Sequence, residues 1–224
     1  MLLSFLGINT KNITITLETL YLTAIRRAEQ IKTAVLVTGT PGVGKTTTSK
    51  LLASKLNAEY LSVTDLVKSK NLVDAVDEQR DTLVADTVKV SEQIKQILEK
   101  AEDSIVIEGH YVVDVVPVHQ VKIVFVLRKD PIKLKLVLEQ RGYSENKVWE
   151  NLSSEVLDVC LWDSVSVSGA NKVCEIDVSN LTVEEVVNEM LQVLENKEQC
   201  RIGTVDWLSK LDAEGKLAEF MQHF

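Results

Sequence analysis

A glycine-rich octapeptide carries the clearest chemical signal in the sequence: residues 39–46 read Gly-Thr-Pro-Gly-Val-Gly-Lys-Thr. They fit the pattern G-x-x-x-x-G-K-[ST], with an apolar run before them and a helical pattern after them. Gly42 and Gly44 let backbone N–H groups turn inward, and the following helix adds its positive dipole end. Lys45 then supplies a mobile cation for nucleotide phosphates, and the Thr46 hydroxyl is placed to bind magnesium. The pattern predicts nucleotide binding without choosing between kinase, switch GTPase, transporter ATPase and helicase.

A carboxylate and an imidazole, Glu108 and His110, follow the third apolar run, at residues 104–107. If this run and the one before the glycine-rich segment form neighbouring strands, Glu108 emerges beside the loop. There it can hold magnesium directly or through water, whereas the alternative is a solvated acid at a strand end. His110 can orient a phosphate, a water molecule or the loop, or it can be a packing residue. Gly109 allows the backbone to pass close to a nucleotide.

Arginines are the cations expected in phosphoryl transfer, which is catalysed mainly by positioning and by neutralising charge on the equatorial oxygens. Arg128 ends the fourth apolar run and Arg141 ends the next helical pattern, so both can return to the phosphate side. The Arg-Gly-Tyr sequence that begins at Arg141 resembles a hinge into a mobile flap. Arg80 lies in an acidic segment that forms either a lobe over an acceptor site, with Arg80 as a phosphate contact, or a solvated charge run. For each arginine the alternative is a surface charge.

Alternating strand and helix patterns are expected to position these residues. Apolar runs predict five strands, at residues 34–38, 60–63, 104–107, 121–127 and 173–176. Helical patterns accompany them at residues 46–57, 85–102, 131–141, 145–163 and 183–196. Continuous apolar runs suit strands that are covered on both faces, so we expect a three-layer α/β/α P-loop fold with a five-stranded parallel sheet. The helix at 131–141 has clear ends, with Asp130 as N-cap, Pro131 in the first turn and Gly142 after the last.

The composition is that of an ordinary globular protein, with 224 residues, 45% of them hydrophobic and 26% charged. The net charge of -8 argues against strong binding to free nucleic acid, because phosphate backbones are bound largely through Lys and Arg. Three separated cysteines fit free thiols in a reducing cytosol: Cys160, Cys174 and Cys200. The apolar start lacks a basic region, and no run reaches the roughly 18 apolar residues of a membrane span. We therefore expect a cytoplasmic protein without direct membrane contact.

The two ends of the chain lie outside this pattern. Residues 1–30 precede the first strand and contain an amphipathic stretch that the fold does not require, so they form an N-terminal extension, either an added helix or a loose arm. The C-terminal tail, residues 197–224, carries large apolar residues at roughly helical spacing, namely Trp207, Leu208, Leu211, Leu217, Phe220 and Met221. We expect this tail to dock on the domain or on a partner.

Several segments together resemble a known family. They are GTPGVGKTT at 39–47, the acidic lobe, IVIEGHYVVDVVP at 105–117, IVFVLRKDP at 123–131 and LEQRGYSENKVWENLSSE at 138–155. In this order they are similar to the adenylate kinase 6 family, also called Fap7 or CINAP, in its archaeal form. The similarity covers about residues 32–196. Its most specific part is the Arg-Gly-Tyr segment with its downstream Asn-Leu-x-x-Glu.

The resemblance implies a nucleoside monophosphate kinase domain at residues 31–196, with an NMP-binding lobe at about 62–84 and a lid at about 140–151. It implies phosphotransfer from ATP with Mg²⁺ to AMP beside a slower ATPase. It also implies a role in small-subunit ribosome and rRNA maturation, through ribosomal protein uS11 and the 30S precursor. By motif position, the residues that would bind the ATP phosphates are Gly42, Gly44, Lys45, Thr46 and Thr47.

The same motifs assign the candidate catalytic and metal-binding residues. Arg141 would contact the nucleotide from the lid and is a catalytic candidate together with Lys45 and His110, whereas Thr46 and Glu108 would bind magnesium. Glu108 departs from the family pattern, because eukaryotic members usually have Asp there and the longer side chain can change the magnesium geometry.

Two functions remain open at this stage, and both can be true. The first is an ATP:AMP phosphotransferase. The second is an ATP-driven ribosome assembly factor that binds a ribosomal protein and has little kinase activity. A GTPase switch is disfavoured because no N-K-x-D guanine motif follows the glycine-rich loop.

Overall fold

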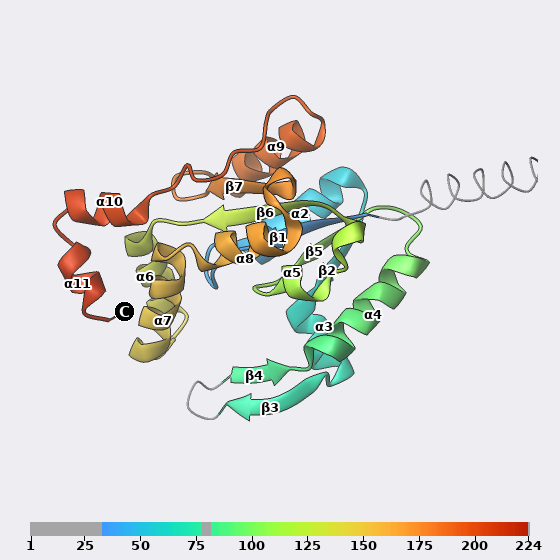
Figure 1. The fold of residues 1–224 in the computed structure, drawn as a ribbon, viewed down its shortest axis with the longest axis horizontal. Coiled ribbons are helices and arrows are strands. Elements are labelled where there is room, and N and C mark those ends of the chain that lie inside the picture. The colour runs from blue at the N-terminus through green and yellow to red at the C-terminus, as the bar shows by residue number, and fades with distance from the viewer. Residues whose placement is uncertain (1–32, 78–81, 224) are drawn as a thin grey trace, which may run out of the picture. The chain divides into compact units, whose positions relative to one another are not determined.

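The computed structural model describes residues 33–77 and 82–223, and Figure 1 shows how their helices and strands are arranged. The predicted N-terminal extension at residues 1–30 and the candidate acceptor contact Arg80 lie outside the described residues. No helix in the described part of the chain is both long enough and apolar enough to cross a membrane.

A five-stranded parallel sheet forms the centre, as the sequence predicts. Its strands are β1 (Ala34–Thr38), β2 (Glu59–Ser62), β5 (Ile105–Glu108), β6 (Val121–Arg128) and β7 (Val173–Asp177), in the order β2-β5-β1-β6-β7. β1 pairs in parallel with β5 and with β6, and Val37 lies opposite Glu108. The strand before the glycine-rich loop is therefore the direct neighbour of the strand that ends in Glu108.

Helices cover both faces of this sheet, which gives the expected three layers (Figure 1). Val35 and Val37 of β1 pack on one face, whereas Ala34 and Leu36 pack on the other, because successive strand residues point to opposite sides. The first face packs against α2 (Lys45–Leu56), α6 (Pro131–Gln140), α7 (Glu145–Val156) and α9 (Val183–Leu194). The second packs against α3 (Val63–Lys70), α4 (Thr87–Lys100), α5 (Val112–Val115) and α8 (Val159–Ser168). Short 3-10 turns at Val118–Gln120 and Ala170–Lys172 precede β6 and β7.

Two helix predictions need correction. The single helix expected at 145–163 is two helices, because Asp158 has φ 58 and breaks the helical backbone between α7 and α8. The helix expected at 85–102 begins only at Thr87, where the Asp86 side chain accepts a hydrogen bond from the Lys89 N–H. The ends of α6 are as expected: Asp130 caps the first turn, and Gly142, with φ 74, follows the last.

A small lobe lies between β2 and α4 in the sequence. It contains α3 and a two-stranded antiparallel sheet of β3 (Val73–Asp77) and β4 (Thr82–Ala85), which is separate from the central sheet. The Ser62 side chain caps α3 by accepting a hydrogen bond from the Asp65 N–H. This segment coincides with the region of the predicted NMP-binding lobe at residues 62–84.

The C-terminal tail folds back onto the domain, which is one of the two placements expected from its sequence. It contains α10 (Trp207–Ala213) and α11 (Leu217–Met221), which lie beside α6 and α7 in Figure 1. Trp207, Leu211 and Phe220 are buried in the same core as α6 and α7. Trp149 of α7 meets the Phe220 ring edge-on, at 5.3 Å between the centroids.

Candidate functional site

A cavity of about 340 Å³ opens at the carboxyl edge of the central sheet. All eight residues that the family motifs assign to the nucleotide, the catalysis or the metal line it, namely Gly42, Gly44, Lys45, Thr46, Thr47, Glu108, His110 and Arg141. They come from four places: the loop after β1, the first turn of α2, the end of β5, and the segment that follows α6. The structure thus brings together residues that lie up to about a hundred positions apart in the sequence.

The loop between β1 and α2 owes its path to its glycines. Gly39 has φ 134, and a Cβ atom there would lie 2.4 Å from the Leu127 carbonyl oxygen. Gly42 has φ 98, and a Cβ atom there would lie 2.8 Å from a Leu134 methyl group. Gly44 precedes α2, and the helix has no side-chain cap at this end. Its first N–H groups are therefore available to an anion, which the helix dipole also favours.

The Lys45 ammonium is held close to this loop. Its Nζ donates hydrogen bonds to the carbonyl oxygens of Gly39, at 2.7 Å, and of Thr40, at 3.1 Å. Burial lowers the pKa of Lys45 below its ordinary value, although Cys160 and Glu108 nearby favour its charged form. An anionic phosphate in the cavity would favour the charge further, because an opposite charge stabilises the protonated amine.

Glu108 and Thr46 form the candidate magnesium side of the cavity. The Thr46 and Tyr60 hydroxyl groups both donate to Glu108 Oε1, each at 3.2 Å. In the described residues there is no cluster of three or more His, Cys, Asp or Glu side chains that could enclose a metal. One carboxylate and one hydroxyl fit Mg²⁺, which binds through one or two carboxylates and phosphate oxygens while keeping several waters. The longer side chain of Glu108 thus remains compatible with the expected role.

Tyr60 was missed by the sequence analysis. Its position in β2, which pairs with β5 in parallel, carries the phenol to the carboxylate at the end of β5. Burial raises the pKa of Tyr60 to about 12, with a further contribution from Glu108. The phenol therefore stays protonated at neutral pH and remains a donor to that carboxylate.

His110 lines the cavity, as expected for a functional residue. Surrounding protein atoms, and then the positive charge of Lys45, lower the pKa of His110 below 6.5, so the imidazole is neutral at pH 7. Cys160 Sγ lies 3.6 Å from His110 Nδ1. Burial raises the pKa of Cys160 to about 11, so this thiol is not ionised at neutral pH and is a poor nucleophile.

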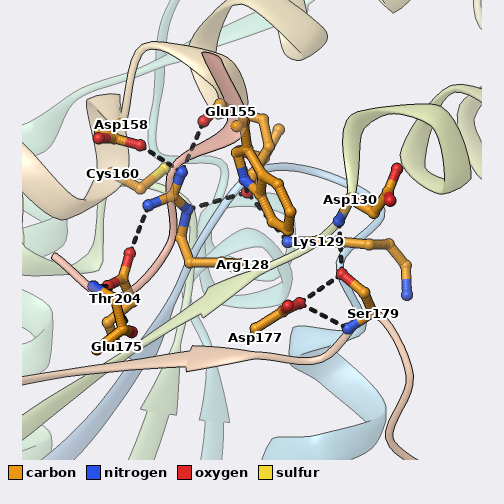
Figure 2. A network of polar contacts seen from close by, with 12 residues as sticks. Arg128, Lys129, Asp130, Glu155, Asp158, Cys160, Glu175, Asp177, Ser179 and Thr204 are labelled. Carbon is orange, nitrogen blue, oxygen red and sulfur yellow. Dashed lines mark hydrogen bonds and ion pairs between the residues drawn. The ribbon is translucent and has the colours of Figure 1, made fainter. Parts of the chain in front are cut away.

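Arg141 and Arg128, which were both expected on the phosphate side, lie in different environments. Arg141 lies at the cavity together with Tyr143. Arg128 does not return to the phosphate side, which corrects the expectation for it. Its side chain is 2% exposed and forms ion pairs with Glu155, Asp158 and Glu175, whose carboxylates surround it in Figure 2. These acids occupy the guanidinium donors because a buried charge must be paired.

Polar residues of α3 and the last residue of β2 also line the cavity, and the sequence analysis did not single them out. They are Ser62, Thr64 and Asp65. The available signal was the Ser-x-x-Asp spacing of Ser62 and Asp65, which is typical of a helix N-terminus and so places both side chains at the start of α3.

Comparisons with known proteins show the family and the fold of the chain. Residues 35–158 match the family model described as "AAA domain". A protein of Methanocaldococcus jannaschii named "Putative adenylate kinase" is 40% identical over 176 residues, which cover 79% of this chain and 93% of the relative. A protein of Saccharolobus solfataricus with the same name is 36% identical, covering 78% of this chain and 87% of the relative. The crystallised shikimate kinase of Acinetobacter baumannii has a similar fold, with a TM-score of 0.54 at 14% identity over 77% of this chain and 98% of that one.

Proposed function

We propose that this chain, which belongs to the same family as the relatives named "Putative adenylate kinase", transfers the γ-phosphoryl group of ATP to AMP, giving two molecules of ADP. The observation that carries this proposal is the single cavity lined by the glycine-rich loop, Glu108, His110 and Arg141. In the transfer, an AMP phosphate oxygen forms a bond to the γ-phosphorus, and the bond from that phosphorus to the β–γ bridging oxygen breaks. The leaving group is ADP, and the product of attack is a second ADP.

We assign the phosphates of ATP to the glycine-rich loop. The N–H groups around Gly42 and Gly44, with the first turn of α2 at Thr46 and Thr47, would bind the β and γ phosphates. Lys45 would leave its two carbonyl partners for the phosphates, where its charge matters most during transfer. Thr46 and Glu108 would hold Mg²⁺, which supplies neutralisation of the phosphate charge when it is bound.

Arg141 and His110 are assigned to the transferred group. Arg141 would neutralise charge on the equatorial oxygens from the lid, because a guanidinium can donate two parallel hydrogen bonds to a phosphate. The attacking AMP phosphate is already an anion, so no strong base is required. His110 lines the same cavity, which suits a role in orienting a phosphate or a water molecule.

AMP would lie on the side of the small lobe. Ser62, Thr64 and Asp65 present hydroxyl groups and a carboxylate to the same cavity as the glycine-rich loop. Hydroxyl groups can bind the acceptor's phosphate, whereas the carboxylate is better suited to the ribose or the base, because it repels phosphate. This arrangement would place the acceptor phosphate opposite Lys45.

As a second function, we propose ATPase activity in the maturation of the small ribosomal subunit, with ribosomal protein uS11 and the 30S precursor as partners in the cytoplasm. The net charge of -8 supports a basic partner, since complementary charge speeds and orients association. Membership of the adenylate kinase 6 family is part of this proposal, and it is supported by the ordered segments from residue 39 to residue 155.

The decisive experiment measures ADP production from Mg-ATP with and without AMP, with Lys45→Ala as the blank. We expect conversion of AMP to ADP in a one-to-one ratio with ATP consumed, and a fall of at least about a hundredfold in Lys45→Ala. The variant should fold normally, because the half-buried Lys45 side chain lines the open cavity, where water can replace its two hydrogen bonds to the loop. ATP hydrolysis at the same slow rate with and without AMP would refute the kinase and favour the assembly ATPase, for which binding to the ribosomal protein is the next measurement.

A further inference from the structure

The C-terminal tail makes polar contacts with the buried ion cluster around Arg128. The Thr204 N–H and hydroxyl donate to Glu175 Oε2 at 2.8 and 3.1 Å. The Trp207 indole N–H donates to Glu155 Oε1 at 3.0 Å. Glu155 and Glu175 are only 2% and 5% exposed, and the contact from Trp207 is buried as well, whereas the exposed Thr204 reaches Glu175 from the surface.

Glu155 connects this tail with the glycine-rich loop. Its Oε1 accepts hydrogen bonds from Arg128 Nε at 2.9 Å, from the Lys129 N–H at 3.0 Å and from Trp207 Nε1 at 3.0 Å. Its Oε2 accepts from Thr40 Oγ1 at 2.5 Å. Three donors at one oxygen and one at the other hold the carboxylate from both sides, so they fix the orientation of its plane. The position of Thr40 thereby depends on donors from β6 and from the tail.

Thr40 stands at the point where β1 turns into the glycine-rich loop. It is 1% exposed, and its carbonyl oxygen is one of the two that hold the Lys45 ammonium. The Thr40 hydroxyl thus ties the loop to Glu155, while the Thr40 carbonyl oxygen accepts a hydrogen bond from Lys45. A misplacement of about 1 Å in such a loop is costly, because phosphate binding needs several N–H groups to point at one anion.

The charge of Glu155 does not oppose an anionic ligand. A carboxylate below a phosphate site would repel the ligand if it were unpaired, but Arg128 and two N–H groups share one of its oxygens. The tail provides one of these N–H groups, from Trp207. It is also anchored independently of Trp207, because Leu211 and Phe220 are buried and Lys210 pairs with Asp130.

We propose that Glu155 is a positioning residue for the glycine-rich loop, and that the docked C-terminal tail holds it in place through Trp207. Affinity for nucleotide phosphates then depends on side chains that do not touch the nucleotide. This inference rests on the proposed nucleotide binding of the loop, but it does not depend on whether AMP is the acceptor. It also gives the tail a role in the chemistry of the cavity, which packing alone does not require.

The test is the binding of Mg-ADP to the full chain by calorimetry, in variants that remove single hydrogen bonds. Thr40→Val removes the hydroxyl at nearly constant volume, and Trp207→Phe removes the indole N–H. We expect each to weaken binding about five- to fiftyfold, in the range of typical couplings between sites. Thr40→Ser keeps the hydroxyl and should retain affinity within about twofold. Trp162→Phe is the matched control for Trp207→Phe, because Trp162 is 71% exposed on α8.

A reciprocal measurement separates coupling from a merely structural role. Coupling between two sites is mutual, so Mg-ADP should slow amide hydrogen exchange in α10 of the wild-type chain, and this protection should be lost in Thr40→Val. If Thr40→Val binds ADP as tightly as the wild type, or if ADP leaves exchange in α10 unchanged, the inference is wrong. That outcome leaves the kinase proposal intact, since AMP-dependent ADP production is measured separately. The comparison of Thr40→Val with Thr40→Ser tests the inference even if Trp207→Phe fails to fold.

Discussion

The open cavity and the buried ion cluster around Arg128 use the same kinds of side chain in opposite ways. In the cavity, Lys45 and Arg141 face a space that an anion can enter. In the cluster, Arg128 is 1% exposed and every ion-pair partner comes from the protein itself. Burial alone would lower the pKa of Arg128, but Glu155 and Asp158 outweigh it and the pKa is raised. A cation near the carboxyl edge of the sheet therefore serves either binding or structure, depending on whether carboxylates satisfy it within the fold.

The largest expected effect is the difference in stability between the same substitution at Arg128 and at Arg141. Arg128→Met should lower the free energy of unfolding by about 3–5 kcal/mol, because it leaves Glu155 and Glu175 buried without their counter-charge. Arg141→Met, the same substitution at the cavity, should change it by no more than about 0.5 kcal/mol. Urea unfolding at neutral pH measures both. A loss below about 1 kcal/mol for Arg128→Met would mean that water reaches the cluster, and the contrast would fail.

The second-largest expected effect is the loss of activity on substitution of Arg141. Arg141→Met should reduce AMP-dependent ADP production by about 10²–10³-fold, as expected when one group that stabilises developing charge is removed. Arg141→Lys should recover only part of this rate, because an ammonium cannot donate the two parallel hydrogen bonds of a guanidinium. Steady-state rates at saturating Mg-ATP and AMP measure the loss. Full activity in Arg141→Met would exclude it from the transfer step.

The sequence predicts the cavity better than the cluster because the two depend on different information. The glycine-rich loop is a local pattern, so the positions of Lys45 and Thr46 follow from spacing alone. The order of neighbouring strands then places Glu108 beside the loop. The partners of Arg128 come from α7, the turn after it and β7, and nothing local in the sequence marks Glu155 or Glu175 as its acceptors. From the sequence alone, Arg128 and Arg141 are therefore equivalent candidates for a phosphate contact.

The division of the expected helix at 145–163 has the same origin. The apolar spacing continues through this segment, so periodicity alone predicts one helix. Asp158 adopts φ 58 and pairs with Arg128 at 2.5 Å, which ends the helical path of α7. The break in the helix thus coincides with a tertiary ion pair, which short-range patterns cannot anticipate.

The smallest expected effect concerns Cys160, which lies between the two regions. Its Sγ is 3.6 Å from His110 Nδ1 in the cavity wall, yet burial raises the pKa of the thiol from 9.0 to about 11. Because the folded state favours the protonated thiol, this group contributes stability that is fully present below pH 9.0 and is lost as the pH rises to about 11. The total loss should be about 2–3 kcal/mol, since one pKa unit corresponds to about 1.4 kcal/mol.

Cys160→Ala should therefore flatten the alkaline decline of stability between pH 9 and about 11. The variant also loses packing contacts, but that loss does not depend on pH, so the slope and not the absolute stability is compared. Unfolding free energies measured by urea in the presence of a reducing agent, at intervals from pH 8 upward, give both slopes. Equal slopes in the two proteins would show that Cys160 ionises as an exposed thiol does. Water would then reach the Cys160 thiol from the cavity, and the region between the phosphate site and the Arg128 cluster would be hydrated.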